Sequence, residues 1–202
     1  MTSVIPINYD LCFEPLFQNF TFNGTEIITI NLPKVTSLII LDASELKIKN
    51  CHLIQDKKII SAKSYLNEKD EKLTINLSKK IKGKAKISIE FTGILNDRLL
   101  GFYKSQYKDS KGKTKYLATT QFEAADARRA FPCWDEPAVK ATFDVSLLVD
   151  KHLDAISNMP VISKKKTGTK ILHKFGRTPI MSTYLLYLGV GEFEYLHGKL
   201  RN

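Results

Sequence analysis

Apolar and polar residues alternate with a period of two along most of this 202-residue chain. The clearest example is KAKISIEFTGIL at residues 84–95, where Ile87, Ile89 and Phe91 would share one face of a strand. No long amphipathic helical pattern is visible, and the best helical candidate is a short turn near residues 124–130. The pattern predicts an antiparallel all-β domain, built as a sandwich or as a large twisted sheet.

Turn-forming residues separate the alternating runs. DSKG at residues 109–112, NMP at 158–160 and TGT at 167–169 each predict a break between strands. The pair Asn23-Gly24 is a further turn signal. The run SLIILDA at residues 37–43 does not alternate and predicts a strand that is covered on both faces. No linker, low-complexity tract or internal repeat interrupts the chain, which predicts a single domain over residues 1–202.

The net charge of +10 comes mainly from lysine and raises the possibility of a nucleic-acid or acidic-membrane partner. The lysines, however, are scattered among short segments of the sequence. Examples are Lys57, Lys58, Lys79, Lys80, Lys82, Lys84, Lys86, Lys164, Lys165 and Lys166. Lysine is also common on solvated turns and edge strands, so we expect neither a nucleic acid nor a membrane as a partner.

The three cysteines, Cys12, Cys51 and Cys133, are widely spaced and form no CxxC pair, which predicts reduced thiols in the cytoplasm. The N-terminal residues have no basic or apolar region typical of a signal peptide, and no apolar run approaches membrane-spanning length. None of the four histidines belongs to an HExxH motif, and GxSxG, P-loop and GxGxxG motifs do not occur. The sequence therefore shows no catalytic motif of its own.

The segment TQFEAADARRAFPCWDEP, at residues 120–137, differs from the rest of the chain. Gln121 and Glu123 stand two residues apart at the end of a strand-like run, so they would share a face while Phe122 points into the core. A paired amide and carboxylate at a strand end can contact a ligand, but can equally be a solvent-exposed strand end. The spacing alone favours the solvent-exposed end.

The remaining residues of this segment predict a loop fixed by charge and packing. We expect at least one of Arg128 and Arg129 to turn inward to a carboxylate such as Asp126, Asp135 or Glu136. The Phe-Pro-Cys-Trp stretch adds bulky apolar side chains that can be buried in the core. Its cysteine, Cys133, has no histidine partner in the sequence pattern and is expected to be a core thiol rather than a nucleophile.

The stretch QFEAADARRAFPCWDEPAVKATFDVSL resembles the signature of the N-terminal domain of gluzincin-class zinc aminopeptidases, the puromycin-sensitive, tricorn-interacting and aminopeptidase N type enzymes. Three further elements agree in order. They are the opening IPINYDLCFEPLFQNFTFNGTEIITI, the element GILNDRLLGFYKSQY and the late strand MSTYLLYLGVGEFEYL. An ordered match in four elements, from about Ile5 to Leu196, is specific to a family in a way that one element is not.

The resemblance implies large twisted antiparallel sheets that form a saddle-like sandwich. It also implies a separate catalytic domain with GxMEN and HExxH motifs, neither of which occurs in residues 1–202. Zinc would belong to the full-length enzyme, and we expect none to be bound by this chain. By the resemblance, Glu123 would bind the free α-amino group of a peptide substrate and Gln121 would line the first side-chain pocket.

Two other hypotheses remain open. A chain without the zinc-binding helix could serve as a non-catalytic scaffold or protein-interaction domain, and the presence of GxMEN and HExxH in the same gene would separate the two cases. A basic nucleic-acid-binding β domain is a third possibility, but the sequence lacks the aromatic and basic platform of such domains.

Overall fold

The protein is described by a computed structural model that covers residues 4–196 and 198. Within these residues the fold is all-β, as predicted, and the helical content is two short 3-10 helices. The strands are β1 (Ile5–Leu16), β2 (Thr21–Asp42), β3 (Lys47–Gln55), β4 (Lys58–Asn67), β5 (Lys72–Ile94), β6 (Gly101–Lys108), β7 (Thr114–Gln121), β8 (Lys140–Asp150), β9 (Asp154–Ser157), β10 (Val161–Thr167), β11 (Lys170–Phe175), β12 (Met181–Ser182) and β13 (Leu188–Gly191). The helices are η1 (Ala127–Arg129) and η2 (Thr183–Leu185). No helix in the described part of the chain is both long and apolar enough to cross a membrane.

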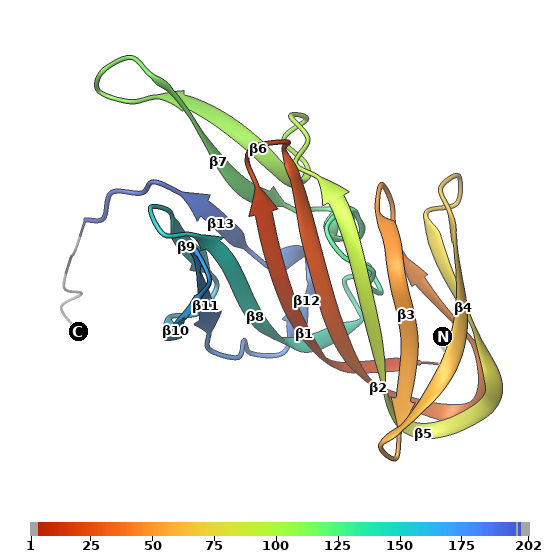
Figure 1. Ribbon diagram of the computed structural model, residues 1–202. Helices are drawn as coiled ribbons and strands as arrows, with labels where there is room; N and C mark the ends of the chain where they lie inside the picture. The colour runs from red at the N-terminus through yellow and green to blue at the C-terminus, as the bar shows by residue number, and fades with distance from the viewer. Residues whose placement is uncertain (1–3, 197, 199–202) are drawn as a thin grey trace.

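The large sheet has nine strands in the order β10-β11-β8-β1-β2-β5-β3-β4, with β12 added beside β8. Its two longest strands, β2 and β5, pair along almost their whole length and bend together, as Figure 1 shows. Register shifts in this pairing lie between Leu32 and Leu38, at the bend. Bulged, strongly twisted strand pairs give a sheet a curved surface. The predicted twisted sheet is confirmed.

One strand pair departs from the antiparallel prediction. β1 and β8 run parallel over a register from Asn8 opposite Thr142 to Phe13 opposite Leu147. The long segment between them in the sequence contains strands β2 to β7 and the loop at residues 122–139. A parallel pair needs a long crossover connection, and this intervening part of the chain supplies it.

The small sheet has the order β6-β7-β13-β9 and packs against the large sheet through apolar side chains. Phe13 of β1 and Phe102 of β6 meet edge to face with ring centroids 5.8 Å apart. Tyr9 of β1 stacks on Phe143 of β8 at 5.0 Å. The buried residues of both sheets form one cluster, which is the core of a sandwich.

The prediction that residues 37–43 form a strand covered on both faces is wrong. Ile39 and Leu41 are buried, but Leu38 and Ile40 are 43% and 45% exposed. Leu38 and Ile40 lie on the outer face of β2, which no other described residues cover with a second layer. An uninterrupted apolar run does not reveal whether a second layer lies over its strand, and here only one face is packed.

Asn23-Gly24 does not form a turn, in contrast to its sequence signal. Both residues lie inside β2, and the chain reverses earlier, at residues 17–20. A Cβ on Gly24 would lie 2.2 Å from Cε2 of Phe91 on the neighbouring strand. The glycine is therefore needed for close packing of an aromatic ring rather than for chain reversal. The predicted breaks are confirmed: residues 109–112 and 158–160 fall between strands, and the break predicted at 167–169 begins at the last residue of β10 and lies before β11.

Candidate functional site

Gln121 is the last residue of β7, and Glu123 lies two residues further along, where the chain leaves the small sheet. Both residues are exposed, whereas Phe122 between them is 2% exposed and packs into the core, as predicted. The side-chain amide of Gln121 donates to the backbone carbonyl of Glu123 at 3.4 Å. The structure thus places the two candidate residues next to each other on the solvent side of the chain.

The outer face of the small sheet beside Gln121 carries aromatic and hydroxyl groups. Thr119 of β7 lies opposite Tyr103 of β6 on one side and Gly189 of β13 on the other. The hydroxyl group of Thr119 donates to the phenol oxygen of Tyr187 at 3.2 Å. A Cβ on Gly189 would lie 2.8 Å from that same oxygen, so the glycine leaves room for the tyrosine. Gln121 therefore ends a surface that can both pack and form hydrogen bonds.

Beyond Glu123 the chain forms a compact, non-regular loop. The backbone N–H of Asp126 donates to the carbonyl of Phe122 at 2.9 Å, and that of Phe131 donates to Ala127 at 3.1 Å. The predicted helical turn is present as the 3-10 helix η1, which is only three residues long. Eight residues of the loop are buried: Phe122, Ala127, Ala130, Phe131, Pro132, Cys133, Trp134 and Asp135. This burial holds the loop against the core.

Arg128 turns inward and binds a carboxylate of its own loop as well as carboxylates from two other parts of the chain. Its Nε donates to Oδ2 of Asp135 at 3.1 Å, and its Nη1 donates to Oε2 of Glu71 at 3.1 Å. Asp42 lies 3.8 Å from the same Nη1. Burial opposes the positive charge, but the bond to Asp135 and the nearby carboxylates outweigh it and raise the pKa of Arg128.

Arg129 makes a second set of ion pairs on the other side of the loop. Its Nε donates to Asp126 at 2.8 Å, Nη1 to Glu45 at 2.7 Å and Nη2 to Glu71 at 3.1 Å. A Cβ on Gly101 would lie 2.9 Å from Cβ of Arg129, so a glycine at the start of β6 leaves room for this arginine. Glu71 bridges Arg128 and Arg129 and ties the loop to the β4–β5 turn.

The inward orientation of the arginines is confirmed, but the sequence prediction of their partners was incomplete. Asp126 and Asp135 do pair with them, whereas Glu136 is exposed and forms no ion pair in the described part of the chain. The partners that were not predicted are Asp42, Glu45 and Glu71. The one signal for them was the position of Asp42 at the end of the apolar run at residues 37–41.

Glu123 differs from the other acidic residues around this loop. Its carboxylate forms no hydrogen bond or ion pair with any residue in the ranges 4–196 and 198, while Asp126 and Asp135 are both paired. An unpaired carboxylate on a fixed support can accept hydrogen bonds from a ligand cation without first breaking an internal bond. The arrangement is therefore suited to bind an ammonium or guanidinium group.

Cys133 is a core thiol, as predicted. It is fully buried, and its backbone N–H and C=O both bond to the backbone of Asp42, at 3.0 Å and 2.7 Å. Burial, together with the nearby negative charge of Asp135, raises the pKa of the thiol well above its ordinary value. A protonated, inaccessible thiol cannot act as a nucleophile.

The side chains of residues 4–196 and 198 do not fit a zinc site. Among the described residues, no three His, Cys, Asp and Glu side chains are grouped so that they could hold a metal ion. The adjacent Cys51 and His52 illustrate the reason, because one is buried and the other points to the opposite face of β3. Structural and catalytic zinc sites need at least three converging protein ligands.

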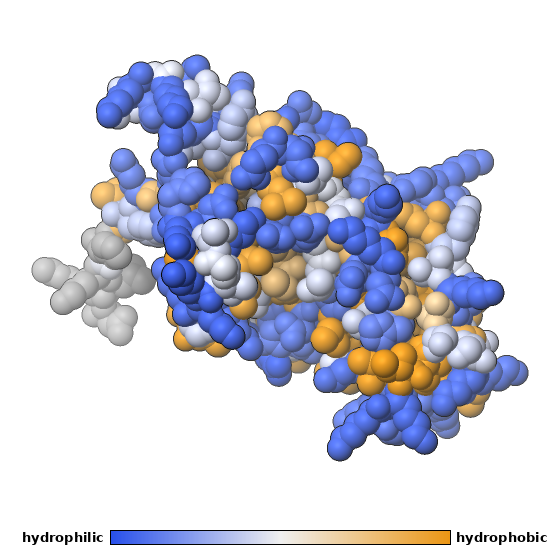
Figure 2. Space-filling view, viewed as in Figure 1, coloured by the Kyte–Doolittle hydropathy of each residue, from blue (hydrophilic) through white to orange (hydrophobic). Residues whose placement is uncertain are grey.

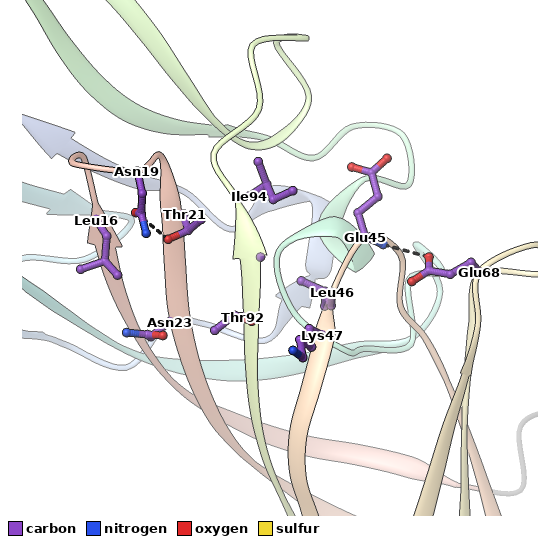
Figure 3. A pocket seen from close by; sticks show the side chains of 11 residues that line it. Leu16, Asn19, Thr21, Asn23, Glu45, Leu46, Lys47, Glu68, Thr92 and Ile94 are labelled. Atoms are coloured by element: carbon purple, nitrogen blue, oxygen red, sulfur yellow. Dashed lines mark hydrogen bonds between the residues drawn. The ribbon is translucent and has the colours of Figure 1, made fainter.

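A separate open groove of about 790 Å³ lies at one end of the large sheet, and neither Gln121 nor Glu123 lines it (Figure 3). Most of its polar groups are already bonded within the protein. The hydroxyl group of Thr21 donates to Asn19 at 2.8 Å, and the carboxylate of Glu45 binds Arg129 and Arg98. We therefore assign no ligand to this groove.

The sequence profile described as the peptidase M1 N-terminal domain matches residues 5–185. The chain is 41% identical to the puromycin-sensitive aminopeptidase of Caenorhabditis elegans, covering 98% of this chain and 21% of that protein. It is 39% identical to aminopeptidase M1 of Arabidopsis thaliana, covering 95% of this chain and 22% of that protein.

A similar match is found in fungi. The chain is 38% identical to the mitochondrial aminopeptidase 2 of Saccharomyces cerevisiae, covering 98% of this chain and 21% of that protein. The chain thus spans about a fifth of the length of the curated relatives it matches.

Proposed function

This chain belongs to the peptidase M1 N-terminal domain family, and we propose that it is the substrate-recognition and scaffold domain of a zinc aminopeptidase that removes N-terminal amino acids from peptides. The proposal covers residues 1–202 as one N-terminal β domain, with catalysis carried out by a domain outside it. The observation that carries the proposal is the exposed, unpaired carboxylate of Glu123 on a loop whose other charges are paired.

The proposed chemistry follows from what an aminopeptidase must recognise. A free peptide N-terminus carries a positive charge, and Glu123 would bind it, with Gln121 beside it at the first side-chain pocket. A charge-assisted hydrogen bond contributes on the order of 1.5–3 kcal/mol. Holding the α-ammonium group fixes the distance to the first peptide bond, so cleavage is restricted to the end of the chain.

We place the zinc and the hydrolytic step outside residues 1–202, because the donor groups in the described part of the chain do not fit a zinc site. When bound in the full enzyme, zinc would supply the Lewis acidity for peptide hydrolysis. The contribution of this chain would be to bind and orient the substrate. We also propose a cytoplasmic location, which the free thiols of Cys12, Cys51 and Cys133 support.

The test is the isosteric variant Glu123→Gln in the protein that joins this chain to a peptidase domain. We expect kcat/KM for an unblocked aminoacyl substrate to fall about ten- to a hundredfold, mainly through KM, because the charged partner of the ammonium is lost. Glu136→Gln is the matched control, since Glu136 is also exposed and unpaired and lies in the same segment. Equal kinetics for wild type and Glu123→Gln would remove Glu123 from the site.

A scaffold or protein-interaction domain without a catalytic neighbour is the competing proposal. In that case the gene would lack the GxMEN and HExxH motifs, and Glu123→Gln would not change the affinity of the domain for its binding partner. Sequencing the rest of the gene therefore separates the two proposals before any kinetics are measured.

A further inference from the structure

Three segments that are far apart in the sequence meet at one end of the large sheet. These segments are residues 32–36 at the bend of β2, 55–59 at the β3–β4 turn and 78–86 at the bend of β5. Leu32 pairs with Gly83. The side-chain amide of Gln55 donates to the backbone carbonyls of Lys82 and Lys84, at 2.9 Å and 3.2 Å. We call this region the basic end, and it lies at the lower right of Figure 1.

The basic end concentrates most of the excess charge of the protein. Its eight lysines are Lys34, Lys57, Lys58, Lys79, Lys80, Lys82, Lys84 and Lys86. The single carboxylate in the three segments is Asp56, so the basic end has a formal charge of +7 out of +10 for the whole chain. All eight lysines are exposed, and none forms a salt bridge within the described residues. Like charges gathered without counter-charges repel one another, so an external anion would relieve the repulsion.

Apolar side chains are exposed among these lysines. Val35 is 60% exposed and Ile59 is 72% exposed. Ile59 pairs across the β3–β4 turn with Ile54, which in turn pairs with Lys86. Figure 2 shows an orange patch bordered by blue at the lower right end of the molecule. Exposed aliphatic groups ringed by lysine are typical of surfaces that contact a partner rather than solvent alone.

We propose that the basic end binds the surface of an anionic phospholipid membrane, which replaces the expectation from the sequence that a membrane is not a partner. Lysines would contact the headgroups, while their methylene stems and the side chains of Val35 and Ile59 would lie in the interfacial layer. The composition of the cluster favours lipid over nucleic acid. It contains no arginine and no aromatic residue, the two residue types that stack on bases or bind them in bidentate fashion.

The test is sedimentation of the chain with vesicles of phosphatidylcholine alone or mixed with phosphatidylserine. We expect binding only to the mixed vesicles and weaker binding as salt rises to about 0.15 M. In the variant Lys79→Gln/Lys80→Gln/Lys82→Gln the partition coefficient should fall about 100-fold, since each lysine near an anionic surface contributes about fivefold. Unchanged thermal unfolding would show that the variant still folds.

The matched control is Lys164→Gln/Lys165→Gln/Lys166→Gln on β10, which removes the same charge from three exposed, unpaired lysines elsewhere. Vesicle binding by this control should stay close to wild type. Equal losses in both triple variants would show that only net charge matters and would overturn the proposal.

The variant Ile59→Ser tests the apolar contact and should weaken vesicle binding. The proposal would also be overturned if Ile59→Ser bound vesicles as tightly as wild type and wild type bound an RNA oligonucleotide equally tightly. These results would show that the basic end binds any polyanion and has no preference for lipid.

Discussion

Asp135 accepts two hydrogen bonds from Arg128 through one oxygen, Oδ2, from the backbone N–H at 3.2 Å and from Nε at 3.1 Å. Its other oxygen accepts from the hydroxyl group of Thr183 at 2.8 Å, and its own backbone N–H donates to Asp42. The Asp135 side chain is 1% exposed. This fully bonded carboxylate closes the loop that carries Glu123 at its start, which explains how an exposed residue is held by a rigid support.

Replacing this carboxylate should therefore destabilise the fold. In Asp135→Ala the guanidinium of Arg128 loses its most buried partner, and we expect the free energy of unfolding to fall by about 3–5 kcal/mol. Urea denaturation measures it. Arg177→Gln is the control, because it breaks the exposed pair with Asp144 and should change the free energy of unfolding far less. Losses of similar size in the two variants would contradict a structural role for the Arg128–Asp135 pair.

Glu26 should make the protein less stable as the pH rises. Its side chain lies in the core between Leu11 and Ile89 and is 1% exposed, and neither carboxylate oxygen has a hydrogen-bond partner among the residues that the structure describes. Burial raises its pKa well above the ordinary value of 4.5. Above pH 4.5 the unfolded chain releases this proton while the folded chain keeps it, so the folded state loses stability as pH increases.

Two substitutions at this position check that account. Glu26→Met should raise the free energy of unfolding at pH 7 by about 1–3 kcal/mol, because an unsatisfied buried polar group is removed. Glu26→Gln should remove the decrease in stability between pH 5 and pH 8 that wild type shows. Parallel stability curves for wild type and Glu26→Gln over this range would show that Glu26 does not carry a raised pKa.

Glu71 should have the opposite effect at acid pH. Burial acts to raise its pKa, but the hydrogen bond from Ser44 and the charges of Arg129 and Arg128 outweigh burial and lower the pKa below 4.5. A lowered pKa in the folded state means that the stabilisation is complete above pH 4.5 and is lost as pH falls through the folded value. In Glu71→Gln the part of the free energy of unfolding that is lost at acid pH through protonation of Glu71 should disappear. Glu90→Gln, at an exposed and unpaired carboxylate, is the control and should follow wild type through the same acid titration of unfolding.

Gly24→Ala should be destabilising although it adds only a methyl group. The new Cβ would lie 2.2 Å from the ring of Phe91, and overpacking of a core typically costs about 1–3 kcal/mol. The additional substitution Phe91→Leu should recover part of this loss. Gly176→Ala is the control, since its nearest neighbour would be 3.6 Å away and thermal unfolding should change little. A Gly24→Ala variant as stable as wild type would show that β2 and β5 can separate at this point.

The alternating pattern of the sequence was enough to predict the strands and the buried faces of most of them. Alternation is a local property, because successive side chains on a strand point to opposite sides, and Ile87, Ile89 and Phe91 are accordingly buried together. The signature segment likewise predicted that at least one of Arg128 and Arg129 binds a carboxylate, and both do.

Contacts between residues far apart in the sequence became visible only in the folded protein. The bend of β2 and β5 brings scattered lysines to one end, and the β4–β5 turn brings Glu71 to both arginines. The same pairing shows that Leu38 and Ile40 face outward and that Gly24 accommodates a ring. These outcomes depend on contacts between residues far apart in the sequence, and a local pattern carries no information about which strands those partners occupy.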